Sequence, residues 1–211
     1  MKLDIVEFEK ELANKKPQDI IKWAVDKFGI KDIVLATSLG VEDQVITDMI
    51  SKIDKNIEIL TLDTGRLFPE SYELLSKTNT FYGIKIKVHT PNQEELMDMV
   101  NKHGINLFYD SIDSRKMCCN IRKILPLKRA LKDKKLWICG LRREQSKNRS
   151  EMKVVEWDDN FNLIKLNPLI DWESKDVWEY VRINNILYNP LHDKGFLSIG
   201  CQPCTRDVKE G

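Results

Sequence analysis

The sequence predicts an α/β fold: a mostly parallel central sheet with helices on both faces. Short runs rich in β-forming residues alternate along the chain with segments of helical periodicity, a pattern that indicates βαβ units. Such units imply right-handed crossovers between parallel strands. Three of the predicted strands end in polar, glycine-containing segments, which is typical of the ligand-binding edge of a parallel sheet.

The first predicted elements are two helices. Residues Leu3–Leu12 place apolar side chains among charges at helical spacing. Pro17 suits the first turn of a second helix, Gln18–Phe28, which has an apolar face, and Gly29 follows as a natural C-cap.

Strands and helices then alternate. The predicted strands are Asp32–Thr37, Ile57–Asp63, Ile84–His89 and Lys135–Gly140, and the predicted helices are Val41–Ser51, Pro69–Tyr82, Gln93–Lys102 and Arg122–Leu131. After Ser150 the pattern changes to a hairpin, Met152–Trp157 with Asn162–Leu166, and then to a helix with Ser174 as its N-cap. No repeat or linker interrupts the chain, so we expect one domain over residues 1–211.

The composition and net charge do not identify a class of partner, so function must be inferred from local features of the sequence. The formal charge is +1 over 211 residues, which favours neither nucleic acid nor a membrane surface as a partner. The N-terminal segment does not resemble a signal peptide, and no apolar run approaches the ~20 residues that cross a bilayer. We therefore expect a cytoplasmic protein, in which grouped cysteines more often serve metal or redox chemistry than disulfides. The sequence leaves open whether the chain forms a homo-oligomer.

Four of the five cysteines occur in two groups, the tandem pair Cys118 and Cys119 and the C-x-x-C of Cys201 and Cys204. Thiolates suit zinc or an iron–sulfur cluster. Adjacent residues leave little room for the turn of a zinc knuckle, whereas each can bind its own iron corner of a cluster. The pattern favours an iron–sulfur site over zinc, with a disulfide or buried unligated cysteines as the remaining alternatives.

Two further segments point to an anionic ligand. Ser38–Gly40 lies between a predicted strand and a helix, the geometry in which backbone N–H groups hold an anion, although a plain turn explains it equally well. Arg142, Arg143, Lys147 and Arg149 follow the fourth strand. Such a run is often a solvated helix face, but at this sheet edge guanidinium groups can bind phosphate or sulfate. Cys139, within the apolar strand, is expected to be buried and inert.

Six segments, in order from about residue 33 to 206, carry a resemblance to a known family. They are Thr37–Asp43, Leu62–Glu70, Cys118–Cys119 followed by Arg122–Lys123, Gly140–Ser146, Asn189–Asp193 and Ser198–Arg206. Together they resemble the assimilatory adenylyl-sulfate/phosphoadenylyl-sulfate reductases, in the branch that contains an iron–sulfur cluster. The resemblance implies an adenine nucleotide α-hydrolase-like fold, in agreement with the strand pattern.

The resemblance also implies roles for individual residues. The expected substrate-binding residues are Thr37, Ser38, Leu39, Gly40, Glu42, Asp43, Leu62, Asp63, Thr64, Gly65, Gly140 and Arg149. The expected catalytic residues, which offset charge around the reacting groups, are Lys123, Arg142 and Arg143. The expected ligands of a [4Fe–4S] cluster are Cys118, Cys119, Cys201 and Cys204.

The implied reaction is thiol chemistry on adenylyl sulfate (APS). A cysteine thiolate attacks the sulfur of the nucleotide, AMP leaves, and thioredoxin or glutaredoxin then releases sulfite from the enzyme S-sulfonate. In the family the nucleophile lies in a C-terminal tail with a Glu-Cys-Gly-Leu-His motif. No such motif occurs in these 211 residues, and we expect the sequence to be a truncated form of a reductase.

Three alternatives remain at this point. Phosphoadenylyl sulfate (PAPS) is the substrate of relatives that lack the four cysteines, and some members resemble enzymes that use both nucleotides. An ATP-using PP-loop enzyme shares the fold, but its usual Ser-Gly-Gly-x-Asp-Ser differs from Thr37–Asp43. A non-catalytic iron–sulfur nucleotide-binding module is the third alternative.

Overall fold

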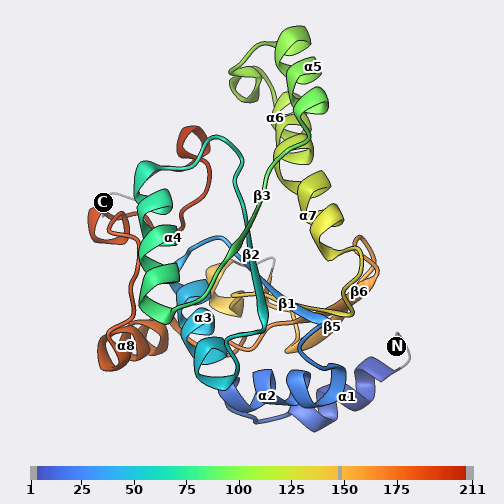
Figure 1. Ribbon diagram of the computed structural model, residues 1–211, viewed down its shortest axis with the longest axis vertical. Coiled ribbons are helices and arrows are strands. Elements are labelled where there is room, and N and C mark those ends of the chain that lie inside the picture. Colours follow the sequence, from blue (N-terminus) through green and yellow to red (C-terminus); the bar gives the residue numbers. More distant parts are fainter. Residues whose placement is uncertain (1–3, 147–148, 208–211) are drawn as a thin grey trace.

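A six-stranded sheet forms the centre of the computed structural model, which describes residues 4–146 and 149–207 (Figure 1). The strands are β1 (Ile33–Thr37), β2 (Glu58–Leu62), β3 (Lys87–His89), β4 (Leu136–Ile138), β5 (Val155–Asp158) and β6 (Leu163–Leu166). Their order in the sheet is β3-β2-β1-β4-β6-β5. All neighbouring pairs are parallel except β5 with β6, so the predicted mostly parallel sheet is confirmed.

The strand order reverses direction at β1. From β1 the chain moves outward to β2 and β3 on one side, and it later returns to place β4 on the other side of β1. A reversal of this kind opens a crevice at the carboxyl ends of the two central strands, where α/β proteins bind their ligands. The segments that begin at Ser38, after β1, and at Cys139, after β4, therefore meet at one edge.

The helices are assigned as follows. They are α1 (Ile5–Leu12), α2 (Pro17–Phe28), α3 (Val41–Ile53), α4 (Pro69–Tyr82), α5 (Gln93–His103), α6 (Ile112–Cys119), α7 (Leu125–Leu131) and α8 (Ser174–Asn184). Gly29 ends α2 with φ of 76° and donates its N–H to Val25, as expected of a C-cap. The sequence located most of these helices because their apolar faces recur at helical spacing.

Alternate residues of β1 enter two different cores, which places helices on both faces of the sheet. Ile33 and Leu35 pack into the larger core with α1, α2, α3 and α8. Val34 faces the opposite side and packs with Leu127 and Leu131 of α7. This alternation is the period-two pattern of a strand that is buried on both faces.

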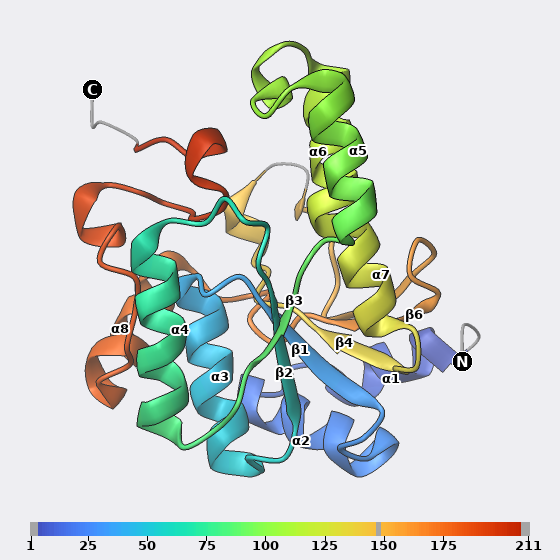
Figure 2. The same cartoon turned by 45° about the horizontal axis from the view of Figure 1, so that its top comes forward.

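An arm projects from the body of the molecule. It consists of residues 93–119, that is α5, a 3₁₀ turn at Leu107–Tyr109 and α6, and Figures 1 and 2 show it standing away from the sheet. Its own small core contains Met99, Leu107, Phe108 and Cys118. The first cysteine of the tandem pair is therefore part of the packing that holds the arm together.

Two of the predicted helices differ in detail from the structure. The predicted helix Arg122–Leu131 is the end of a longer helical run that begins with α6 and includes a π-helical segment, Asn120–Ile124. The N-cap of α8 is Glu173 rather than Ser174, because the backbone N–H of Glu173 donates to the Asp176 carboxylate in a capping box.

The C-terminal hairpin is more closely integrated than the sequence indicated. Its two strands pair antiparallel as predicted, but β6 also pairs parallel with β4 and so extends the main sheet. No helix in the described part of the chain is long and apolar enough to cross a membrane. Leu3 and Lys147 lie outside the described residues.

Candidate active site

Four cysteines line one pocket. Cys118 and Cys119 come from the end of α6, and Cys201 and Cys204 from the 3₁₀ turn Gln202–Cys204 and the residue before it. All five cysteines of the chain are free thiols in the structure, so the disulfide alternative is not observed. The other lining residues are Arg66, Phe108, Arg115, Arg122, Lys123 and Pro203. The fold thus joins two cysteine groups that are about eighty residues apart.

The helical run around the tandem pair explains how both thiols reach the pocket. Cys118 and Cys119 occupy the last turn of α6, and the π-helical segment Asn120–Ile124 follows at once. A π-helical turn changes the direction of successive side chains, and such turns are frequent at functional sites. The π-helical segment lies just before Pro126, which lacks an N–H and so cannot donate the usual helical hydrogen bond.

The C-x-x-C is anchored to the segment that follows β2. Leu67 and Cys201 form an isolated antiparallel bridge, and the N–H of Gln202 donates to the carbonyl of Arg66 at 2.8 Å. Thr64 Oγ1 lies 3.2 Å from Cys201 Sγ. The segment Asp63–Arg66 therefore connects the cysteine pocket to the carboxyl end of the sheet.

The donor set of this pocket is four thiols, the ligands that an iron–sulfur cluster takes. Among the residues that the structure describes, no three His, Cys, Asp or Glu side chains converge closely enough to hold one metal ion. A [4Fe–4S] cluster takes one thiolate at each of four separate irons and so needs four sulfurs spread around a larger centre. Four thiols around one pocket meet that requirement, so the residues present fit the group.

Arg122 is a buried cation beside these thiols, and the sequence placed it in a family-like segment without assigning it a role. Its side chain lines the pocket, and its Nη1 donates to the carbonyl of Thr64 at 2.6 Å. Its Nε is buried and has no hydrogen-bond partner in the structure. Burial raises the pKa of the Cys118 thiol, and the charge and hydrogen bond of Arg122 oppose that rise. Arg122 thus favours thiolate in the pocket, which is the form that binds metal.

The segment Asp63–Gly65 uses its own polar groups to hold its turn. Asp63 Oδ1 accepts hydrogen bonds from the N–H of Gly65 and from Tyr72 Oη, both at 2.8 Å. Gly65 has φ of 68°, and a Cβ there would lie 3.5 Å from Arg122 Nη1. The turn therefore packs against the side chain of Arg122, which lines the cysteine pocket.

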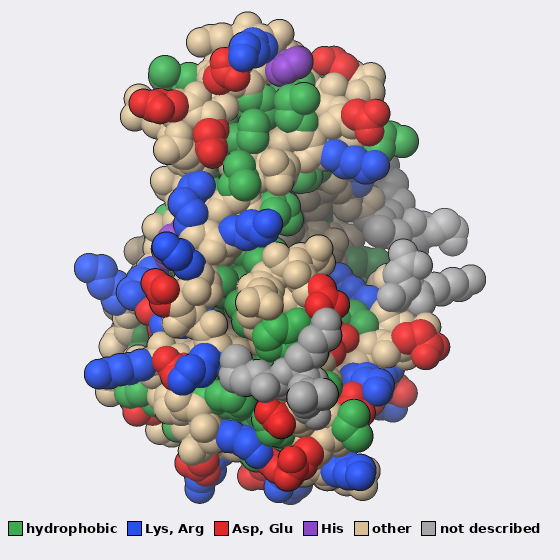
Figure 3. Space-filling model, turned by 90° about the vertical axis from the view of Figure 1, so that its right-hand side faces the viewer, with side chains coloured by type: hydrophobic (Ala, Val, Ile, Leu, Met, Phe, Trp, Pro, Cys, Tyr) green, Lys and Arg blue, Asp and Glu red, His purple; other side chains and the backbone are tan. Residues whose placement is uncertain are grey.

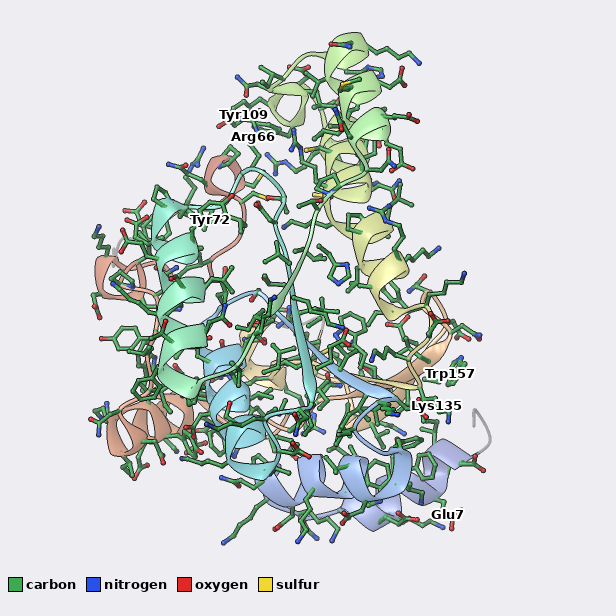
Figure 4. The ribbon with its side chains drawn as sticks, in the orientation of Figure 1. Glu7, Arg66, Tyr72, Tyr109, Lys135 and Trp157 are labelled. Atoms are coloured by element: carbon green, nitrogen blue, oxygen red, sulfur yellow. The ribbon has the colours of Figure 1, made fainter. Side chains whose placement is uncertain are left out.

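Arg66 connects the same turn to the arm. Its guanidinium donates to the carbonyl of Ile105 at 2.6 Å and lies 5.4 Å from the centre of the Phe108 ring. Figure 4 shows Arg66 next to Tyr109, which belongs to the 3₁₀ turn of the arm. The space-filling view of Figure 3 shows the surface hollowed between the arm and the body, with Lys and Arg side chains above and below the hollow.

The loop after β1 uses its own N–H groups in internal hydrogen bonds, and anion binding by it stays a prediction. Leu39 is buried and has a left-handed φ of 63°, a strained conformation for a residue with a branched side chain. The N–H of Ser38 donates to Asp43 Oδ2 at 2.6 Å, and the N–H of Leu39 donates to Thr37 Oγ1 at 2.9 Å. The N–H of Gly40 donates to Ser38 Oγ at 3.4 Å. The first intrahelical bond of α3 runs from Gln44 to Gly40, so the N–H groups of residues 41–43 have no acceptor within the helix.

The arginines after β4 make internal contacts. Arg142 is buried; its Nη2 lies 2.9 Å from Glu42 Oε1 and its Nη1 lies 2.6 Å from Glu144 Oε2. Arg143 donates to the carbonyl of Met152 and pairs with Asp171. Arg149 contacts Gln145. The segment after β4 lies at the carboxyl edge of the sheet, as expected. Direct contact of these arginines with substrate stays a prediction.

Cys139 is buried, as the sequence predicted. It directly follows β4, is 5% exposed and does not line the pocket of the other four cysteines. Burial raises the pKa of its thiol well above the ordinary value. A thiol of this kind is a poor nucleophile because the thiolate is the reactive form.

The pairing of Arg142 with Glu42 leads to a stability prediction. The Glu42→Gln substitution leaves a buried guanidinium with a weakened partner, so we expect the free energy of unfolding in urea to fall by roughly 3 kcal/mol. The matched control is Glu73→Gln, which breaks an exposed ion pair with Lys77 and should leave stability unchanged. Equal stability of the two variants would show that Arg142 is held by other contacts.

Comparison with known proteins agrees with this arrangement. Residues 32–207 match the family described as the phosphoadenosine phosphosulfate reductase domain. The chain belongs to this family. An adenosine 5'-phosphosulfate reductase of Allochromatium vinosum is 46% identical over 182 residues, which is 86% of this chain and 71% of the relative. One of Pseudomonas aeruginosa is 42% identical over 211 residues, or 97% and 78%.

Solved structures support the same family and its wider fold. The phosphoadenylyl-sulfate reductase of Candida auris, solved as a phosphate complex, superposes with a TM-score of 0.83 at 29% identity and covers 98% of both chains. The FMN adenylyltransferase of Candida glabrata reaches a TM-score of 0.61 at 15% identity over 94% of this chain and 63% of its own. The latter likeness shows the fold alone.

Proposed function

We propose that this chain binds adenylyl sulfate and takes part in its reductive cleavage to sulfite and AMP. Relatives at 42–46% identity over most of the chain carry the name adenosine 5'-phosphosulfate reductase. The observation that carries the proposal is the position of the turn Thr64–Arg66, which follows β2 at the carboxyl edge of the sheet and contacts the pocket of four cysteines. The ATP-using alternative rests on fold alone.

We infer that Cys118, Cys119, Cys201 and Cys204 hold a [4Fe–4S] cluster. The support is their shared pocket and the buried Arg122 cation beside it, which offsets part of the negative charge of four thiolates. A bound cluster would supply a fixed, polarising charge next to the substrate crevice. Free thiols are stable in a reducing compartment, so we also propose a cytoplasmic location.

The chain's own groups bind and orient the nucleotide in this account. The N–H groups of residues 41–43, at the start of α3, have no acceptor within the helix and would suit the oxygens of a phosphosulfate. Lys123 lines the cysteine pocket and would place positive charge between it and the substrate. Positive charge at that point stabilises the phosphate oxygen of AMP as it leaves.

The reaction needs a thiolate and two electrons. The thiolate attacks the sulfur of the sulfo group, an S–S bond forms, and the S–O bond to the phosphate of AMP breaks with its electron pair going to AMP. One thiol of a dithiol such as thioredoxin or glutaredoxin then attacks the enzyme sulfur and releases sulfite, leaving a mixed disulfide. The second thiol attacks this bond, which frees the enzyme thiol and leaves the dithiol protein as a disulfide. With four cysteines assigned to the cluster and Cys139 buried, none of the five cysteines in these 211 residues is assigned as the attacking thiol.

Turnover of the cluster-loaded protein under anaerobic conditions tests this function. The chain alone and the chain extended by a cysteine-bearing C-terminal segment are each incubated with APS and thioredoxin. We expect equal amounts of sulfite and AMP from the extended chain, and none from a matched extension with serine in place of cysteine. An inactive extended chain overturns the function, and sulfite from the chain alone overturns the assignment of all four grouped cysteines to the cluster.

A further inference from the structure

The buried carboxylate of Asp43 connects the two segments that meet at the carboxyl edge of the sheet. Asp43 lies in the first turn of α3 and is 7% exposed. Its Oδ2 accepts the N–H of Ser38 at 2.6 Å and the hydroxyl of Ser38 at 2.7 Å. The backbone N–H of Gly140, just beyond β4, also donates to this carboxylate. One side chain therefore receives donors from both the loop after β1 and the segment after β4.

The approach of Gly140 to Asp43 is too close for any other residue. A Cβ built at Gly140 would lie 2.3 Å from Asp43 Oδ1, 3.1 Å from Asp43 N and 3.1 Å from Glu42 Cβ. The backbone after β4 thus packs directly against the first turn of α3. The geometry requires an acceptor on each side of the Asp43 carboxylate, one toward Ser38 and one toward Gly140.

We propose that ionised Asp43 is a positioning residue, which holds the Ser38–Gly40 loop against the segment after β4 in the conformation that binds the sulfonucleotide. Only the carboxylate offers two acceptor oxygens; the protonated acid and an asparagine each offer one acceptor and one donor. Either change sets a donor against a donor at one of the two contacts. The identity of the ligand rests on the proposed function. The role of Asp43 in holding the Ser38–Gly40 loop against the segment after β4 does not depend on that function.

The surroundings of Asp43 make this contact sensitive to pH. Burial raises the pKa of Asp43 to about 6, the bonds from Ser38 and Gly140 oppose the rise, and Glu42 adds to it. The other ionisable groups facing this corner are the buried thiol of Cys139 after β4 and Arg142, which is paired with Glu42. His192 feels the charge of Glu42 from the C-terminal loop.

Two measurements test the proposal on the cluster-loaded chain. The first is the dissociation constant for APS at about pH 8 and about pH 5, on either side of the transition. The second is hydrogen exchange of the peptide around residues 36–41, corrected for the intrinsic effect of pH. The variant is Asp43→Asn, and the control is Asp48→Asn, a buried carboxylate of the same helix that bonds to Tyr180 and Lys52 instead.

The wild type should bind APS at least tenfold more weakly at the lower pH, with faster exchange in the loop. Asp43→Asn at the higher pH should match the wild type at the lower pH and change little with pH, whereas Asp48→Asn should follow the wild type. Wild-type affinity and loop protection in Asp43→Asn overturn the proposal. If APS does not bind to the wild type at all, the proposed function is wrong, and the positioning role of Asp43 is then judged from hydrogen exchange of the loop alone. If Asp43→Asn does not fold, the pH step in wild-type loop exchange decides.

Discussion

The Cys201→Ser variant is expected to lose its cluster and with it the reductive cleavage of APS. Serine offers a hard hydroxyl in place of a soft thiolate, and its oxygen is a poor ligand for iron in a sulfur-rich site. The variant also loses the sulfur that lies 3.2 Å from Thr64 Oγ1. We expect iron to fall from about four atoms per chain to well under one, measured with acid-labile sulfide and visible absorbance after anaerobic reconstitution.

The matched control is Cys139→Ala. Cys139 is buried and does not line the pocket, so this variant should retain its iron while losing some stability to the small cavity that it creates. Full iron content in Cys201→Ser, or loss of iron in Cys139→Ala, would contradict the assignment of the pocket.

The second large effect is expected from Gly140→Ala. The added methyl would lie 2.3 Å from Asp43 Oδ1, and that carboxylate is held in place by Ser38. Because neither partner is the free end of a flexible side chain, the segment after β4 must move away from α3. We expect the free energy of unfolding to fall by about 2 kcal/mol and APS affinity to fall at least tenfold.

A stability control for this variant is Gly200→Ala. Gly200 has ordinary contact distances around a built Cβ, the nearest being 3.5 Å to Thr205 Oγ1, and no left-handed backbone. Its unfolding free energy should stay close to that of the wild type. Wild-type APS affinity in Gly140→Ala would show that the junction between α3 and the segment after β4 does not shape the substrate crevice.

Much of the fold could be predicted because its signals are local. Pro17, Gly29 and Pro69 mark helix ends through backbone geometry alone, and the apolar runs of β1 and β2 are short and rich in β-formers. The meeting of the segments after β1 and β4 followed from the rule that parallel strands present their carboxyl ends to one edge. The sequence also separated Cys139 from the other cysteines by its place in an apolar run.

The contacts within the site could not be predicted because they depend on distant partners. Nothing near Arg142 in the sequence indicates that Glu42, one hundred residues earlier, pairs with it. Arg122 likewise gives no local sign that it is buried against the carbonyl of Thr64. The π-helical turn after Cys119 has no reliable sequence signature, so the start of that helical run was missed.

The most direct test of the account is the binding of APS and PAPS to the cluster-loaded 211-residue chain, measured anaerobically by titration calorimetry. We expect APS to bind with a dissociation constant in the micromolar range, AMP to compete with it, and PAPS to bind more weakly. Absence of APS binding at millimolar concentration, in protein with a full complement of iron, would contradict the central claim.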